Sequence, residues 1–333
     1  MAKPSSSVGV KGRSTEDALR AIREIRNAPE RYDLKRDLAP FLRHKSNHVA
    51  AAAAGTVERL EAVALAQDLV DAFIELMQEP AKRDPGCKAL LAIAKALVVM
   101  DQGAVRAYFL GLRHVQMEGS FGPPVDAAAE LRGVCAQGLA RMAHPDALPE
   151  CVTLLVDREV AARAGAVRAI ADAGVQEGAL LLRLKALVGD PKIEVTAECF
   201  ASLLRLAPAP SLAFVANFLG GATEEVAEAA AFALGESRMA AAFPLLRAAW
   251  DKTAQAERKR TLLLSMAMLR LDESLEFLME RVAEDSERSA ADAIAALALY
   301  GRDETVRTRA EATVVKRRSA VLRSVFDREF RPA

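Results

Sequence analysis

The chain has few aromatic residues and no excess of charge of either sign. Phe, Trp and Tyr make up 5% of its 333 residues, and Trp250 is the single tryptophan. The apolar residues include many alanines, which favour close contact between helices over a wide core of bulky side chains. The 45 basic residues balance 45 acidic ones, so no overall positive field attracts a phosphate backbone. Nucleic acid would need a local basic patch.

Cysteine is also scarce, and its spacing argues against the common metal and redox motifs. Cys87, Cys135, Cys151 and Cys199 form no C-x-x-C pair, as a zinc ribbon or a redox motif would require. Each cysteine lies inside a helical pattern. We therefore expect buried, reduced thiols.

Two further absences concern membranes. Residues 1–14 are rich in serine and glycine and contain no apolar stretch of the kind that a secretory signal needs. Charged residues also interrupt every apolar run before it reaches the length of about 18 residues that spans a bilayer. We expect a soluble, cytoplasmic protein that does not insert into a membrane.

Short helical patterns, by contrast, recur in pairs along most of the chain. The leading pattern of each pair is expected at 33–43, 65–78, 103–115, 146–156, 176–188, 209–219, 239–251 and 272–283. The trailing pattern is expected at 47–60, 86–99, 126–142, 158–173, 192–206, 223–236, 254–270 and 287–300. Because one such pair cannot bury its apolar face alone, stacked neighbours must complete the core. The sequence predicts an all-α fold, a right-handed alpha-alpha superhelix (α-solenoid) of about eight helix pairs.

The residue types indicate how these helices pack. A trailing helix places small residues on one face, as at Ala229, Ala230 and Ala233, and these let two backbones approach closely. Leading helices carry larger residues at the same spacing, as at Leu275 and Leu278. No stretch alternates with a period of two between hairpin turns, so no sheet is expected.

Three segments carry a resemblance to a known repeat family: HPDALPECVTLL at 144–155, GDPKIEVTAECFASL at 189–203 and TEEVAEAAAFALGES at 223–237. They resemble HEAT repeats, in particular the short bacterial type seen in phycobilisome-lyase-like proteins, and the resemblance covers 32–300. It implies that the trailing helices line a concave surface. That family often has an arginine directly after the valine that opens the trailing helix, where this chain has Ala161, Thr196 and Ala227. The Asp–Arg ladder between repeats is therefore expected to be incomplete.

Two segments depart from the regular spacing. The sequence QMEGSFGPPV at 116–125 lengthens one connection, because its glycines and prolines cannot extend either neighbouring helix. It is either a protruding contact element with Met117 and Phe121 as apolar anchors, or a tolerated insertion. After Gly301, a charged segment with an apolar stripe is expected to cap the solenoid. The predicted division is a flexible tail at 1–14, the repeats at 15–301 and a basic capping region at 302–333.

No constellation of catalytic residues is apparent. His44 and His48 have the i, i+4 spacing of metal ligands, but an expected turn and helix cap between them removes the shared face. The glycines of the long connection lack the Gly-Lys-Ser/Thr ending of a phosphate loop. Trp250 follows Phe243 by seven residues and is expected in the core. We predict no metal, no cofactor and no enzymatic activity, although helical DNA glycosylases and bilin lyases are the natural enzymes for comparison.

The polar positions of the trailing helices are the candidate contact surface. They are nominated by lying opposite the apolar stripe, and their mixed signs suit a protein segment better than a polyanion: Arg163, Arg168, Glu198, Arg205, Glu228 and Glu236. Each could equally form salt bridges between neighbouring repeats. The main functional hypothesis is a non-catalytic, protein-binding scaffold or regulatory adaptor. The alternative is a nucleic-acid-binding or DNA-modifying protein that uses the basic patch at Lys316, Arg317 and Arg318.

Overall fold

The computed structural model describes residues 14–101, 103–119, 122–221 and 223–331. Within these ranges the chain forms twenty α-helices and two very short strands, so the fold is the all-α solenoid predicted from the sequence. The predicted N-terminal tail lies outside the described residues, except for Ser14. In the ranges described, no helix is both long and apolar enough to span a bilayer. The chain divides into two units, Met1–Leu181 and Leu182–Ala333. This division does not test the predicted limits at residues 14 and 301.

In the first unit, each inner helix packs against the next inner helix along the chain. The inner helices are the predicted trailing ones: α3 (Asn47–Arg59), α6 (Lys88–Val99), α8 (Ala129–Arg141) and α10 (Val160–Asp172). The outer helices that precede the last three are α4 (Ala66–Leu76), α7 (Val105–Leu112) and α9 (Ala147–Leu154). The unit also contains α1 (Thr15–Asn27), α2 (Leu34–Asp37) and α5 (Pro80–Arg83), and α11 (Gln176–Val188) crosses the boundary to the second unit.

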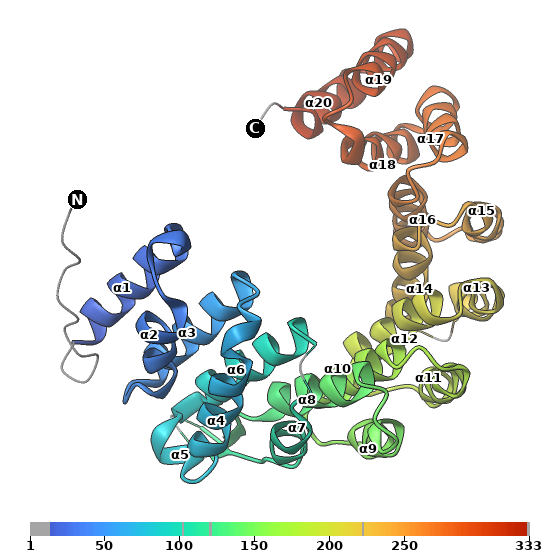
Figure 1. The fold of residues 1–333 in the computed structure, drawn as a ribbon. Coiled ribbons are helices and arrows are strands. Elements are labelled where there is room, and N and C mark those ends of the chain that lie inside the picture. Colours follow the sequence, from blue (N-terminus) through green and yellow to red (C-terminus); the bar gives the residue numbers. More distant parts are fainter. Residues whose placement is uncertain (1–13, 102, 120–121, 222, 332–333) are drawn as a thin grey trace. The chain divides into compact units, whose positions relative to one another are not determined.

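The second unit repeats this arrangement. Its inner helices are α12 (Ile193–Leu206), α14 (Glu224–Glu236), α16 (Ala256–Met268), α18 (Glu287–Leu297) and α20 (Ala320–Glu329). Its outer helices are α13 (Pro208–Ala216), α15 (Phe243–Lys252), α17 (Asp272–Glu284) and α19 (Glu304–Arg317). In Figure 1, α13 and α15 lie on the same side of the row formed by α12, α14 and α16. The segment predicted as a capping region forms a further pair, and its α20 continues the inner row by packing against α18.

Short 3-10 turns join several of these helices. They span Pro29–Arg31, Ala39–Arg43, Val63–Leu65, Pro85–Cys87, Asn217–Gly220, Ala240–Ala242 and Ala298–Tyr300. The turn at Asn217–Gly220 is η6, which directly continues α13.

Neighbouring inner helices approach most closely where two glycines meet. A Cβ atom added to Gly133 of α8 would lie 2.8 Å from the Cα of Gly165 on α10, closer than real Cβ atoms come. Similarly, a Cβ on Gly235 of α14 would lie 2.5 Å from the carbonyl oxygen of Ser265 on α16. The small residues of the trailing pattern thus allow the backbones to come into contact.

Most inner helices end in the same way, with a left-handed residue two positions after the last helical one. These residues are Glu61, Asp101, Ala143, Gly174, Arg238 and Arg270. After α8, for example, the N–H of His144 donates to the carbonyl of Leu139 at 3.0 Å, and the N–H of Ala143 donates to that of Ala140 at 2.9 Å. These two hydrogen bonds satisfy the last helical carbonyls, and the left-handed residue turns the chain toward the next outer helix.

The expectation that no sheet is present is wrong at one place. Strand β1 (Met117–Glu118) pairs in antiparallel register with β2 (Val125–Asp126), Met117 opposite Asp126 and Glu118 opposite Val125. Strands of two residues are too short to produce a readable alternation. Polar side chains hold the hairpin instead, since the Glu118 carboxylate accepts the N–H of Gly86 at 2.8 Å and Gln116 Nε2 donates to the carbonyl of Asp84 at 2.9 Å.

Candidate protein-binding face

Helix α14 shows which side of an inner helix stays uncovered. Its neighbours α12, α13 and α16 bury residues 227, 229–231 and 233–235. Four exposed or half-buried residues recur at helical spacing along the remaining side: Glu225, Glu228, Phe232 and Glu236. This stripe is the side of α14 that no described helix covers.

The two neighbouring helices extend the stripe. On α12 the uncovered residues are Glu194, Glu198, Ala201 and Arg205, and on α16 they are Glu257, Arg260, Leu264 and Met268. The Thr261 hydroxyl donates to a carboxylate oxygen of Glu228 at 3.2 Å, which sets the register of α16 against α14. One turn further along, Phe232 and Leu264 occupy equivalent positions. We call the three stripes the inner face.

The inner face is acidic around an apolar line. Two of its charged side chains are balanced by α18, since Glu257 lies 3.1 Å from Arg288 and Arg260 lies 3.9 Å from Asp292. No hydrogen bond or ion pair joins the side-chain carboxylates of Glu194, Glu225 or Glu236 to another described residue. Carboxylates that are exposed and uncompensated attract a positively charged partner and repel a phosphate backbone.

The structure places most of the predicted contact residues on such stripes. Glu198, Arg205, Glu228 and Glu236 belong to the inner face of the second unit. Arg168 lies on the corresponding stripe of α10, in the first unit. Their role in binding stays a prediction.

The two predicted anchors of the long connection differ in what the structure describes. Met117 is exposed, at 57% of its full surface, on strand β1 of the hairpin. Phe121 lies outside the described residues.

Arg163 has a different place from the other nominated residues. Its side chain is buried, and its Nη1 donates to the backbone carbonyls of Asp157 and Arg158 at 2.8 and 3.0 Å. It therefore holds the turn before α10 and is not on the uncovered side of that helix. A polar residue on an alanine-rich helix is predicted from sequence to be exposed. Here the guanidinium is buried because it donates hydrogen bonds to neighbouring carbonyls.

A buried ion network in the first unit was not predicted. Arg132 of α8 donates to both carboxylate oxygens of Asp157 at 3.0 Å, to Asp126 at 2.6 Å and to the carbonyl of His114 at 2.9 Å. Arg132 and Asp126 are both almost fully buried. The arginine stands 31 residues before Arg163, so the two occupy equivalent places in successive repeats. Arg132 thus makes an Asp–Arg contact between neighbouring repeats, from a position later in its helix than that of Ala161 in α10.

Hydrogen bonds decide the ionisation of this network. Burial by itself raises the pKa of Asp126. The N–H of Gln116, the Arg132 guanidinium and the N–H of Ala128 outweigh that effect, and the net result is a pKa below the ordinary value. Burial lowers the pKa of Arg132, but the carboxylates of Asp157 and Asp126 raise it by more, so the net result is a raised pKa. Both groups are therefore charged at neutral pH.

The basic patch of the alternative hypothesis is partly engaged in the fold. Arg317 donates from Nη1 to the carbonyl of Ala283 and from Nη2 to that of Asp285, both at 2.7 Å. It thereby caps the end of α17, where orphan carbonyls favour a cation. Arg309 and Arg323 are paired with Glu276 and Glu311. Arg317 of the predicted patch is thus engaged in the fold, and two further arginines of this region are paired with carboxylates.

Trp250 is in the core, as its spacing predicted. It is 8% exposed, and its ring stacks edge-on against Phe277 with centroids 5.3 Å apart. The amine of Lys259 lies 4.3 Å from the ring centroid, and Arg281 lies 5.5 Å from it. The ring is thus enclosed by neighbouring repeats and presents no open platform for a base.

The cysteines are free and buried, as expected. Burial raises the pKa of Cys87, Cys151 and Cys199 to about 12, and it raises that of Cys135 further. Cys87 is a left-handed residue that precedes α6, which corrects its predicted place inside a helix. Among the residues that the structure describes, no three His, Cys, Asp or Glu side chains gather to hold a metal ion.

Comparison with known proteins finds similarity to solved structures at low sequence identity. No family model matches the chain, and no curated protein matches its sequence. Among solved structures, human deoxyhypusine hydroxylase in complex with glycerol is similar over 81% of this chain and 97% of its own, with 19% identity and a TM-score of 0.30. The CpcE–CpcF complex of phycocyanin lyase from Nostoc sp. is similar over 97% of this chain and 100% of its own, with 12% identity and a TM-score of 0.35. An engineered protein is similar over 95% of this chain and 94% of its own, with 14% identity and a TM-score of 0.36.

These similarities correct one prediction. The chain was expected not to be an enzyme, because its sequence contains no evident catalytic constellation. Two of the similar structures are named as a hydroxylase and a lyase. The fold therefore does not exclude catalysis, and the prediction is withdrawn.

Proposed function

We propose that this helical-repeat scaffold binds another protein through the inner face of α12, α14 and α16, and that the bound segment is basic and amphipathic. The observation that carries the proposal is the uncompensated charge of Glu194, Glu225 and Glu236 beside the apolar pair Phe232 and Leu264. Basic side chains would pair with the carboxylates at the rim, and apolar ones would cover the central line.

The register between the helices supports a continuous surface. Thr261 ties α16 to α14, and Arg288 and Asp292 tie α18 to α16, at sequence separations close to one repeat. Neighbouring stripes are therefore aligned, and a bound segment that crosses the helices meets one stripe after another. An acidic surface is a poor site for nucleic acid, since phosphates would be repelled.

Charge reversal tests the proposal. We expect the Glu225→Lys/Glu236→Lys variant, used as bait in a native cell extract, to lose proteins that the unchanged chain captures at low salt. The matched control is Asp251→Lys/Glu273→Lys, which makes the same charge change at exposed positions of the outer helices α15 and α17. For a purified captured protein, the inner-face variant should weaken binding about tenfold or more, and added salt should weaken binding to the unchanged chain.

Two results would contradict the proposal. One is equal capture by the inner-face variant and the control variant. The other is a captured fraction that is mainly nucleic acid and that survives reversal of the glutamates. In either case circular dichroism should show that both variants keep their helical content, because all four positions are exposed.

A further inference from the structure

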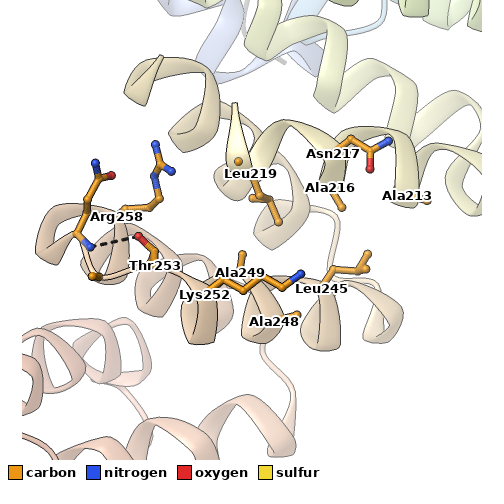
Figure 2. A pocket seen from close by; sticks show the side chains of 13 residues that line it. Ala213, Ala216, Asn217, Leu219, Leu245, Ala248, Ala249, Lys252, Thr253 and Arg258 are labelled. Atoms are coloured by element: carbon orange, nitrogen blue, oxygen red, sulfur yellow. Dashed lines mark hydrogen bonds between the residues drawn. The ribbon is translucent and has the colours of Figure 1, made fainter. Parts of the chain in front are cut away.

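A cavity of about 550 Å³ lies in the second unit, between two successive outer helices. Figure 2 shows Ala216 of α13 and Leu219 of η6 on one side of the opening and Ala249 of α15 on the other, and Ala248 of α15 also lines the cavity. The turn after α15 and the first residues of α16 close one end, at Thr253 and Arg258. The volume falls within the range of about 300–1,000 Å³ that is usual for small-molecule sites. The cavity is lined mainly from outer helices and their turns, and Arg258, its residue from α16, does not belong to the inner face.

The cavity exists between the helices because the side chains that line it there are short. Four alanines, at positions 213, 216, 248 and 249, stand where leucines would fill the space between the helices. Leu219 and Leu245 provide the larger apolar contacts. Contact between these residues and the apolar body of a ligand is favourable, since water leaves both surfaces.

Two cationic side chains line the cavity. Lys252 and Arg258 both line it, and no aspartate or glutamate is among the lining residues. Neither cation has a hydrogen bond or an ion pair with another described residue. The Nε atom of Arg258 is buried without a partner. A buried, unpaired donor is costly, and an anionic acceptor next to it recovers that cost.

We infer that this cavity binds a small organic carboxylate whose apolar body lies against the alanines and whose carboxylate pairs with Arg258. The planar guanidinium matches the two oxygens of a carboxylate. An inorganic anion would leave the apolar walls unused. An extended peptide would need hydrogen-bond partners for its main chain. The lining offers three uncharged polar side chains for this, those of Asn217, Thr253 and Gln255.

Isothermal titration with octanoate tests the site. We expect one saturable site, with octanol, which lacks the charge, and acetate and inorganic phosphate, which lack the apolar body, each binding at least tenfold more weakly. Arg258→Met should weaken octanoate binding about ten- to a hundredfold, as expected for a lost charged hydrogen bond. Ala248→Phe should abolish binding, because a ring at this exposed position fills the space between the helices without entering the core.

The controls repeat each change elsewhere in the same unit. Arg302→Met removes an exposed arginine, and Ala312→Phe adds a ring to an exposed helical alanine. Both should bind octanoate as the unchanged chain does. The inference is overturned if octanoate shows no saturable binding, if octanol or phosphate binds as tightly, or if Ala248→Phe and Arg258→Met bind like their controls. None of these outcomes bears on the inner face, so the two proposals fail separately.

Discussion

Arg132→Met is expected to destabilise the first unit strongly, because it removes the cation of a buried network. The guanidinium makes four hydrogen bonds, two of them to Asp157 and one to Asp126. Methionine retains much of the apolar stem but leaves Asp126 charged and buried, with only two N–H partners. Breaking a buried ion pair from one side costs about 3–5 kcal/mol. That is a large share of the roughly 5–15 kcal/mol by which a domain is stable.

Urea unfolding monitored by circular dichroism, with hydrogen exchange of α8 amides, measures this cost. Arg113→Met is the matched control in the same unit, since its side chain is 68% exposed and pairs with Glu150. An exposed pair of this kind contributes about 0–1 kcal/mol. Adding Asp126→Asn to Arg132→Met should recover about 1–3 kcal/mol, because the uncompensated charge is then gone.

The pH dependence gives a second check on the same network. Since the pKa of Asp126 is lowered by folding, its contribution to stability is present above the unfolded pKa of about 4 and is lost as the pH falls through the folded value. In Arg132→Met the carboxyl loses a hydrogen bond that lowers its pKa, so its proton binds more readily. The stability difference between the two proteins should therefore be largest at neutral pH and shrink in acid. A cost at neutral pH no greater than that of Arg113→Met would refute the reasoning.

Two further predictions concern close packing and the thiols. Gly165→Ala should lower the free energy of unfolding in urea by about 1–3 kcal/mol, because its Cβ would meet the backbone at Gly133. Gly55→Ala, in the open middle of α3, should instead raise it by about 0.5–1 kcal/mol. Equal effects of the two substitutions would show that α8 and α10 can move apart without cost. With its pKa raised to about 12 by burial, Cys199 should react with iodoacetamide at pH 8 at least about a thousandfold more slowly in the folded chain than in urea, and fast labelling of the folded form would contradict its burial.

The helix pairs could be predicted because burial imposes a period on the sequence. Ala229, Ala230 and Ala233 recur at the spacing of one helical face, and that face is the one that neighbours cover. Trp250 was placed in the core by the same reasoning. The remaining side of α14 is then the uncovered one, which is why Glu228 and Glu236 could be assigned to a stripe.

The missed features depend on contacts between distant residues. The helical pattern predicts that the charged side chains of Arg132 and Arg163 face solvent. Acceptors for both lie instead in the turn before α10, which contains Asp157. The break between α19 and α20 lies at Arg318, which takes a left-handed conformation where the sequence has neither glycine nor proline. The serine cap that follows, Ser319, accepts the N–H of Leu322, and serine alone is too common to mark a helix start. The cavity beside Arg258 depends on the spacing of two helices, which no local pattern records.

The left-handed residues that end the inner helices leave room for a more stable chain. At most of these turns the position belongs to Glu61, Asp101, Ala143, Arg238 or Arg270, and a side chain in that conformation costs about 1–2 kcal/mol that glycine avoids. The same turn after α10 already has Gly174. Glycine at these turns should therefore stabilise the chain without changing the inner face or the cavity beside Arg258.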